Sequence, residues 1–570
     1  MIFILVLLNL IRFIGVDISP PGFYADEAAG ATQVLCLTET GHDFYGNWLP
    51  FFAQGFPGAG LYTPFFLYGE ALWTSIFGNS IAAFRTFSGL VTSVTVLFLF
   101  LLVRHKVNLR AAFYVAFIAS ILPWAFQFSR IAWDPPLAVM FLIIGLWIIC
   151  TNRAVWLAGI FFAFASYSYP PVRVSVTLLV IFMPMMSLRK KGVLFASFAL
   201  VSIPLIIQLS NPEFLVRSKQ LAIWNHPELN PRPEMGIFGY AVLFYDQFAS
   251  HFTGTFLFNE GDKNLRHSIS GYGLLTWIEK FSLTIGLGYL LVLGLRNRLL
   301  KNQRKIFSSE EQLLLKIAFL GIIFGVIPSA LTSDSVPHAL RSLAVWPFYA
   351  ILSGILIYRF GESTWSKATL VLTVAFGLLY FGSYLNFYFS KYPEQAKNYF
   401  KVNNFNGIDH AYKRISKDHL TCDQAKSELS LPIVPILNQE FEFGGGNDYL
   451  GNGWLRPESW GVWSTGYKSS LLFPVPKGEP KILSLNMRAF LTPLNPSQSI
   501  TILVNNKVSK NFIFTDQEQH LIEIPLEKSV LSGDKIGVDI DVKSPVSPKK
   551  MGISDDDRLL GISLISGKFE

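Results

Sequence analysis

A succession of long apolar segments is the feature that most constrains how this chain can fold. The first covers residues 2–18, and each is close to the roughly 20 residues that an α-helix needs to cross the hydrocarbon core of a bilayer. The others lie at 82–103, 111–128, 133–150, 154–168, 172–188, 192–209, 273–295, 312–331, 341–358 and 366–388. We therefore predict a polytopic α-helical membrane protein with about eleven transmembrane helices.

The charge of the chain supports this class and excludes a nucleic-acid partner. Charged residues are 15% of the 570 residues and hydrophobic residues are 51%, which is too little charge to cover a soluble protein of this size. The net charge of +8 comes largely from short basic runs between apolar segments, at 104–110, 189–191 and 296–305. Such runs mark the cytoplasmic side. The charge therefore reports orientation in the membrane, with the N-terminus inside and the C-terminus outside.

This orientation places three segments of the predicted transmembrane domain, residues 1–390, on the outer face. They are about 19–80, 210–271 and 332–341. The first apolar run has no basic segment before it and no small-residue cleavage site before Pro20, so we interpret it as a retained helix rather than a signal peptide. The stretch 154–188 is interrupted by Tyr169-Pro170-Pro171 and is interpreted as two short helices.

The sequence pattern changes after about residue 388. Residues 391–435 are polar and form a predicted connector that is partly helical, whereas 436–570 contains short alternating runs bounded by Gly, Pro, Asn and Asp. That pattern is typical of an antiparallel β-sandwich. Trp454, Trp460 and Trp463 could stack on sugar rings, although packing between sheets is the favoured role. The acidic segment 555–557 could bind calcium, but an acidic surface loop is the favoured interpretation.

The cysteines and the known motifs indicate no metal and no cofactor. Cys36, Cys150 and Cys422 have no metal-ligand spacing. Cys36 and Cys422 are both predicted on the outer side and could pair, although nothing in their spacing requires it. The chain has no HExxH, CxxC or P-loop motif, and Gly444-Gly445-Gly446 is interpreted as a turn.

Ionisable residues are rare within the predicted spans and gather at their outer ends, which favours a site at the outer membrane surface over a midplane transport pathway. Asp26 and Glu27 follow the first span by only a few residues. Adjacent carboxylates in an apolar setting can act as a general base for a hydroxyl. The alternative is that they are acidic residues at a helix N-terminus, where negative charge is favourable.

Further motifs follow Asp26-Glu27 in a fixed order. They are Gly41-His42-Asp43, Leu61-Tyr62-Thr63-Pro64 and Phe77-Gly78-Asn79-Ser80, with Arg85 opening the second span. Over roughly residues 1–390, this combination resembles the GT-C superfamily of integral-membrane glycosyltransferases, above all protein O-mannosyltransferases and lipid A aminoarabinose transferases. The resemblance implies catalytic roles for Asp26 and Glu27. It implies substrate-binding roles for Asp43, Tyr62 and Arg85.

Two later clusters agree with this resemblance. Residues 260–267, which end in Arg266-His267, resemble the superfamily's "GD…RH" signature, and 334–341, with His338 and Arg341, resemble its "PHALR" signature. Arg offers paired donors to phosphate oxygens, so these residues and Arg130 are predicted to bind a lipid phosphate at the outer interface. For a single Arg the alternative is a contact with lipid headgroups.

The resemblance implies transfer of a monosaccharide from a polyprenyl-phosphate donor to a hydroxyl acceptor, by a metal-independent inverting displacement at the outer face of the plasma (inner) membrane. The partners would be that donor, membrane lipids, and an acceptor that is a protein, a lipid or a cell-envelope glycan. The C-terminal domain resembles the jelly-roll modules of bacterial glycosyltransferases. The alternative is a non-enzymatic transporter or flippase of lipid or polysaccharide with a glycan-binding sandwich. The transferase reading requires the acidic pair and the two His/Arg clusters to meet at one outward-facing site.

Overall fold

The computed structural model describes most of the chain as two compact units. The first comprises Met1–Lys401 and Arg414–Cys422, and the second comprises Val402–Lys413 and Asp423–Glu570. The described residues are 1–54, 61–151, 154–184, 186–286, 288, 307–361, 366–400, 421–423, 437–438, 440–443, 449–455, 458, 460–476, 478–531, 535–553 and 557–570.

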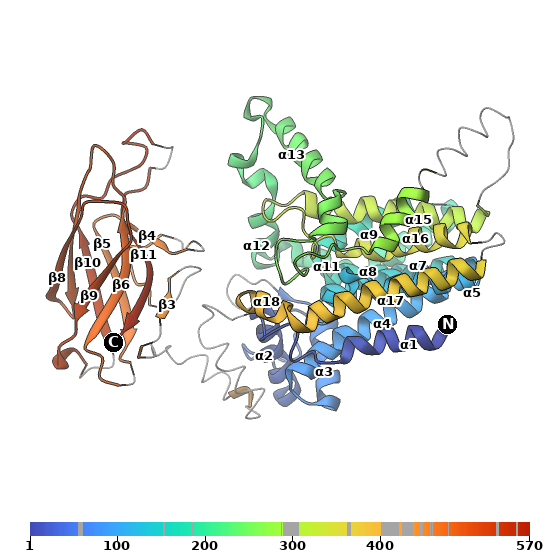
Figure 1. Cartoon of the computed structure of the whole chain (residues 1–570), viewed down its shortest axis with the longest axis horizontal. Coiled ribbons are helices and arrows are strands. Elements are labelled where there is room, and N and C mark those ends of the chain that lie inside the picture. Colours follow the sequence, from blue (N-terminus) through green and yellow to red (C-terminus); the bar gives the residue numbers. More distant parts are fainter. Residues whose placement is uncertain are drawn as a thin grey trace. The chain divides into compact units, whose positions relative to one another are not determined.

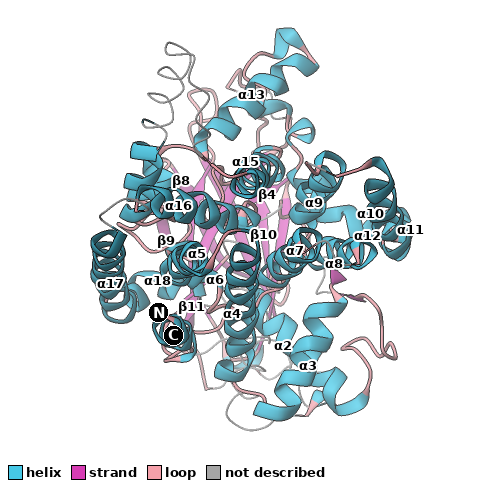
Figure 2. Cartoon of the chain, turned by 90° about the vertical axis from the view of Figure 1, so that its right-hand side faces the viewer, coloured by secondary structure: helices cyan, strands magenta, loops and turns pink. Residues whose placement is uncertain are grey.

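The first unit is helical, and many of its helices run alongside one another (Figure 1), so that Figure 2 looks along them. The helices are α1 (Ile2–Leu10), α2 (Ala25–Thr40), α3 (Pro64–Phe77), α4 (Ile81–Lys106), α5 (Leu109–Ile121), α6 (Pro123–Phe128), α7 (Pro135–Cys150), α8 (Val155–Ser168), α9 (Pro170–Phe182), α10 (Leu188–Val201), α11 (Ile203–Ile207), α12 (Pro212–Leu221), α13 (Ile237–Ser250), α15 (Ser309–Ala330), α16 (Trp346–Phe360), α17 (Ser366–Ser390) and α18 (Tyr392–Phe400). One continuous core of apolar side chains joins most of them, but α2, α3, α11 and α12 lie outside it.

Local chemistry sets several helix boundaries. The Ser80 hydroxyl accepts from the N–H of Ala83 and caps the start of α4. The last turn of α4 is basic, and its positive charge interacts favourably with the negative pole of the helix dipole. The predicted division of 154–188 is confirmed, because α9 begins at Pro170. The predicted span 111–128 is instead two helices, since Pro123 cannot continue α5 and opens α6.

The helical unit has the apolar helices of a membrane protein. Among the described residues, α4, α15 and α17 are each long and apolar enough to cross a membrane. Residues 188–210 form a pair of helices bent by 54°, and six further apolar helices are shorter. The predicted count of about eleven spans is not confirmed. Most of the predicted span 273–295 beyond residue 286 lies outside the described residues.

Two buried arginines hold the segment after α1 against the bundle. Arg12 and Arg130 are fully buried, and a guanidinium has five N–H donors. Those of Arg12 reach the side chains of Asn9 and Ser129 and the backbone oxygens of Ala119, Ser120 and Ala125. Those of Arg130 reach the backbone oxygens of Ile11, Arg12, Gly15 and Ser19. The α1 helix ends at Leu10 and is followed by a 3-10 turn, Ile11–Phe13, so it is shorter than the predicted first span.

Cys36 of α2 forms a disulfide with Cys422, whereas Cys150 is free and buried. We expect peptide mapping of the unreduced protein to recover the Cys36–Cys422 pair, and Cys150 to react with alkylating reagents only after unfolding. Replacing Cys36 or Cys422 by serine should lower the free energy of unfolding by about 2–4 kcal/mol. The double variant should lose no more than either single variant. Free thiols at both positions in protein from an oxidising compartment would contradict the pairing.

The second unit contains two antiparallel sheets. The strands are β3 (Glu440–Glu442), β4 (Val462–Thr465), β5 (Lys468–Pro474), β6 (Ile482–Ala489), β7 (Gln498–Val504), β8 (Lys507–Phe514), β9 (His520–Pro525), β10 (Lys535–Val542) and β11 (Leu560–Phe569). One sheet has the order β5-β10-β7-β8, and the other has β3-β11-β6-β9 with β4 also paired to β11. Alternate residues of both sheets enter one apolar core, which gives the predicted antiparallel β domain.

The tryptophans of this domain have different surroundings. Trp454 is partly buried against the core, and its Nε1 donates to the backbone oxygen of Ser470 at 2.8 Å. Trp463 alternates with the core residue Val462 and lies 5.5 Å from the guanidinium of Arg488. The favoured role, packing between sheets, therefore fits Trp454 but does not fit Trp463. Most of the acidic segment 555–557, and most of the predicted connector beyond α18, lies outside the described residues.

Candidate functional site

Asp26 and Glu27 lie in the first turn of α2, where carboxylates favour the positive pole of the helix dipole. They have opposite surroundings, because Asp26 is exposed and Glu27 is only 1% exposed. The hydroxyl of Tyr24, the residue before α2, donates to Oδ2 of Asp26 at 2.6 Å. Asp26 is therefore the carboxylate of this pair that can reach a substrate.

Glu27 forms a buried ion pair with Arg85 of α4. Arg85 Nε donates to Oε1 at 2.9 Å and Nη2 donates to Oε2 at 2.8 Å. The backbone N–H groups of Tyr24 and Ala132 also donate to this carboxylate. The remaining donors of Arg85 reach the backbone oxygens of Val16, Pro20 and Gly22. The geometry therefore favours positioning roles for Glu27 and Arg85, in place of the catalytic and substrate-binding roles that the sequence predicts.

Tyr62 lies beside Asp26, as expected for a residue of the same site. It belongs to the short strand β2 (Leu61–Tyr62), which pairs with β1 (Ala53–Gln54), and its hydroxyl donates to the backbone oxygen of Asp26 at 3.4 Å. Burial raises the pKa of Tyr62 well above its usual range, and the negative charges of Asp26 and Asp134 raise it further. Tyr62 is thus a neutral phenol on which the charges of two aspartates act.

Asp43 is fully buried and does not face a cavity directly. Its carboxylate accepts from the backbone N–H of Asn47 at 2.8 Å and from Asn47 Nδ2 at 2.9 Å. The buried carboxylate therefore orients the Asn47 side chain. The predicted substrate-binding role of Asp43 is better described as holding Asn47.

The two His/Arg signatures come together in space. The rings of His267 and His338 lie 4.6 Å apart, and His267 Nδ1 donates to Oδ2 of Asp262 at 3.0 Å. Burial lowers the pKa of His338 well below its usual range, and the positive charges of His267, Arg341 and Arg266 lower it further. Residues 77 positions apart along the chain are also joined by the Ala339 N–H, which donates to Asp262 Oδ2 at 2.8 Å.

Tyr24 links this cluster to the acidic pair. The guanidinium of Arg266 lies 4.2 Å from the centroid of the Tyr24 ring, whose hydroxyl donates to Asp26. Trp133 adds a second link, since its ring lies 5.6 Å from that of Tyr24 and 5.9 Å from that of His267. The structure thus brings Asp26 and the cation cluster to the same place, although their segments are far apart in the sequence.

The arginines that the sequence predicts to bind phosphate differ in how many N–H donors remain unused by the protein itself. Arg130 uses all five N–H donors on backbone oxygens, so the geometry favours a structural role over phosphate binding. Arg341 donates to Oδ1 of Asp334 at 2.5 Å and to Thr332 Oγ1 at 2.8 Å. Arg266 donates from Nε to Asn264 Oδ1 at 3.3 Å, and its Nη groups are in no hydrogen bond that the described part of the chain supplies.

Asp262, His267 and His338 also form the one described group that could hold a metal ion. Each offers a ligand atom within 4.8 Å of the others, and all three side chains are buried. An oxygen–nitrogen set of this kind suits a divalent cation such as zinc. The hydrogen bonds from His267, Asn264 and Ala339 account for the Asp262 carboxylate without an ion.

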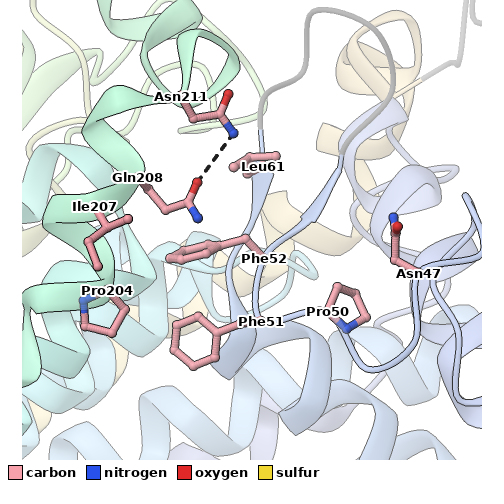
Figure 3. A pocket seen from close by; sticks show the side chains of 9 residues that line it. All are labelled: Asn47, Pro50, Phe51, Phe52, Leu61, Pro204, Ile207, Gln208 and Asn211. Atoms are coloured by element: carbon pink, nitrogen blue, oxygen red, sulfur yellow. Dashed lines mark hydrogen bonds between the residues drawn. The ribbon is translucent and has the colours of Figure 1, made fainter.

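A cavity of about 580 Å³ lies beside the first outer segment, residues 19–80. It opens between the segment around β1 and β2 and the turn after α11, Gln208–Ser210. The lining residues, shown in Figure 3, are Asn47, Pro50, Phe51, Phe52, Leu61, Pro204, Ile207, Gln208 and Asn211. None of the predicted site residues lines it, but Asp43 holds Asn47 and Tyr62 follows Leu61.

No protein-family model matches the chain, and no curated protein matches it in sequence. Its fold is similar to that of the archaeal oligosaccharyltransferase AglB from Archaeoglobus fulgidus, solved with an inhibitory peptide and a dolichol-phosphate, with a TM-score of 0.41, 16% identity, and coverage of 76% of this chain and 60% of that chain. ArnT from Cupriavidus metallidurans, bound to undecaprenyl phosphate, has a TM-score of 0.39, 13% identity, and coverage of 75% and 74%.

Both are GT-C glycosyltransferases. Both likenesses are of the fold alone, because both sequence identities are below 25%. The chain spans about 60% of the length of the oligosaccharyltransferase, and both TM-scores are below 0.5. The roles of residues in this chain therefore rest on its own geometry.

Asp134 is a residue of the site that sequence reasoning missed. It is the residue before α7 and is half-buried, and its charge acts on Tyr62 together with that of Asp26. The available signal was Asp134-Pro135-Pro136, in which proline at the first helical position places the aspartate at the outer end of a span. Asp134 and Asp26 thus act electrostatically on the same phenol.

Proposed function

We propose that this chain is a glycosyltransferase that moves a monosaccharide from a polyprenyl-phosphate donor to a hydroxyl acceptor at the outer face of the membrane. The observation that carries the proposal is Tyr24, which holds the exposed carboxylate of Asp26 through its hydroxyl and the guanidinium of Arg266 on its ring. A base for the acceptor and a cation for the donor phosphate lie on two sides of one side chain. The motif resemblance to the GT-C superfamily supports the same reaction.

The chemistry is a single displacement at the anomeric carbon. Asp26 takes the proton of the acceptor hydroxyl as the acceptor oxygen forms its bond to that carbon. The bond from the anomeric carbon to the phosphate oxygen breaks, and its electron pair leaves with the polyprenyl phosphate. Attack and departure on opposite faces invert the anomeric centre. Tyr62, whose hydroxyl donates to the Asp26 backbone, and Asp134, whose charge acts on Tyr62, are assigned to orienting the acceptor.

The departing phosphate needs positive charge that is already in place, because preorganised charge costs no reorganisation during the reaction. Arg266 and Arg341 supply fixed charge. His267, whose Nδ1 is held by Asp262, presents Nε2, and His338 lies against it. In this proposal Glu27, Arg85 and Arg130 shape the site without touching substrate. The chain would lie in the plasma membrane, with the β domain outside the cytoplasm.

The test uses the purified full-length chain, reconstituted with a panel of polyprenyl-phosphate hexoses and pentoses, and follows release of polyprenyl phosphate. Replacing Arg266 by glutamine should raise KM for the donor at least tenfold, with a smaller effect on KM for the acceptor, because one charged hydrogen bond is worth about 1.5–3 kcal/mol. Arg232→Gln, an exposed arginine of the 210–271 segment, is the matched control and should change neither value.

Two outcomes would contradict the proposal. Lipid or polysaccharide that moves across the bilayer with no sugar transfer from any donor would favour the flippase alternative. Loss of transfer in EDTA with recovery on adding zinc would place an ion at Asp262, His267 and His338 and end the metal-independent mechanism.

A further inference from the structure

The cavity beside the first outer segment is lined by apolar side chains and side-chain amides. Its described lining carries no charged side chain: two phenylalanines, two prolines, a leucine and an isoleucine alternate with the amide groups of Asn47, Gln208 and Asn211. Figure 3 shows Gln208 and Asn211 on one side and Asn47 on the other, with Phe52 between them. Flat apolar surfaces and amides therefore face the same space.

This lining does not suit either the phosphate or the polyprenyl chain of a lipid-linked donor. A phosphate would need cations, and the described lining has none. A polyprenyl chain would bury three amides against hydrocarbon. This would cost free energy, because a hydrocarbon offers a buried polar group no hydrogen-bond partner. The ligand that fits is neutral, and it has both apolar faces and groups that donate and accept hydrogen bonds. A carbohydrate has both, since its ring presents C–H faces and each hydroxyl donates and accepts.

Contacts with one another and with residues outside the lining hold the amides and rings of the cavity in place. Asp43, which is fully buried, accepts two hydrogen bonds from Asn47. Asn211 Nδ2 donates to Gln208 Oε1 at 3.4 Å. The ring of Phe51 is 51% exposed while its edge packs against Tyr167 at 5.6 Å, and Phe52 stacks on the same tyrosine at 6.0 Å. Such preorganisation lowers the cost of ordering side chains on binding.

The cavity also adjoins the carboxylates of the proposed reaction. Leu61 lines the cavity, and the next residue, Tyr62, donates to the Asp26 backbone; successive residues of a strand point to opposite faces. On the other side, Phe52 contacts Phe214 at 5.9 Å, and the guanidinium of Arg173 lies 4.5 Å from the centroid of that ring. A ligand in the cavity is thus separated from the Asp26 site by the thickness of one strand.

We propose that this cavity binds one unit of a neutral oligosaccharide and that this oligosaccharide is the acceptor. Because the cavity and Asp26 lie on opposite faces of β2, a neighbouring unit of the same glycan carries the hydroxyl that reaches Asp26. The identification as acceptor rests on the proposed function; the carbohydrate class rests on the lining alone. The volume of about 580 Å³ is within the range of about 300–1,000 Å³ that is usual for small-molecule sites. Residues lining the cavity would decide which glycan is modified, and Asp26 would decide whether it reacts.

The experiment measures binding of neutral tri- to hexasaccharides of mannose, glucose, galactose and N-acetylglucosamine to the full-length chain in detergent, by saturation-transfer NMR and calorimetry. At least one should bind. Gln208→Leu and Phe51→Ala should each weaken it about tenfold, the loss of one amide or one stacking contact. Leu209→Ala, in the same turn, 50% exposed and outside the lining, should bind as the native chain does. The bound sugar should also become glycosylated when donor is added.

Three results would overturn the inference. Binding of a serine- and threonine-rich peptide with no oligosaccharide bound would make the acceptor a protein. Oligosaccharide binding that Gln208→Leu and Phe51→Ala leave unchanged would place the sugar elsewhere. Release of polyprenyl phosphate from the donor by water, with no oligosaccharide bound, would refute the carbohydrate cavity and leave the proposed function standing. The converse, a bound oligosaccharide with every donor intact, would refute the proposed function and the acceptor role while the carbohydrate class survives.

Discussion

Asp26→Asn is expected to lower kcat for sugar transfer by about 10²–10⁴-fold, the usual contribution of a general base, with KM for the donor nearly unchanged. Asparagine keeps the size of the side chain and still accepts from the Tyr24 hydroxyl, but it cannot take the acceptor proton. Because Asp26 is exposed, the variant should melt at the same temperature as the native chain. Initial rates with donor and acceptor varied separately are the measurement.

Asp246→Asn in α13 is the matched control, since Asp246 is an exposed aspartate of another outer segment and should be neutral. Tyr24→Phe separates the two functions of Tyr24. It removes the hydroxyl that donates to Asp26 and keeps the ring under Arg266, so kcat should fall while KM for the donor stays. Native rates in Asp26→Asn would mean that another group is the base.

Breaking the Glu27–Arg85 pair is expected to lower the stability of the fold and to leave kcat of the folded protein largely unchanged. Both side chains are fully buried, and an uncompensated buried charge costs about 3–5 kcal/mol. Glu27→Gln and Arg85→Met should therefore each lower the melting temperature of the chain in detergent, and any folded fraction of Glu27→Gln should keep most of its kcat. The double variant should recover part of the loss. Recovery stays incomplete because the backbone oxygens of Val16, Pro20 and Gly22 lose their donor.

Lys106→Met tests whether burial causes the loss of stability, because the Lys106–Glu310 pair at 2.9 Å is more exposed, with side-chain exposures of 16% and 47%. That variant should change the free energy of unfolding by no more than about 1 kcal/mol. A Glu27→Gln protein that melts like the native chain but has lost transfer would show that Glu27 acts on substrate, as the sequence predicts.

The arginines show where the predicted and the observed site differ. Residues 81–106 and 366–390 could be recognised as apolar helices, and Pro170 as a helix start, because hydropathy and proline act locally. The motifs placed Arg85, Arg130 and Arg266 together at the outer ends of spans. Nothing local distinguishes them, yet two of the three use every donor on the protein itself, and Arg266 stacks on Tyr24.

The sequence by itself determined that this chain is helical and membrane-embedded with an antiparallel β domain, because periodicity and hydropathy are properties of neighbouring residues. It also singled out Asp26 and the two His/Arg signatures. Only the tertiary structure decided which carboxylate is exposed, which cations remain for a ligand, and that Cys36 meets Cys422. It also decided that aromatic rings and amides from residues 47–61 and 204–211 line one cavity. Those outcomes depend on contacts between residues far apart in the chain, and the pattern of neighbouring residues does not determine which distant residues come together.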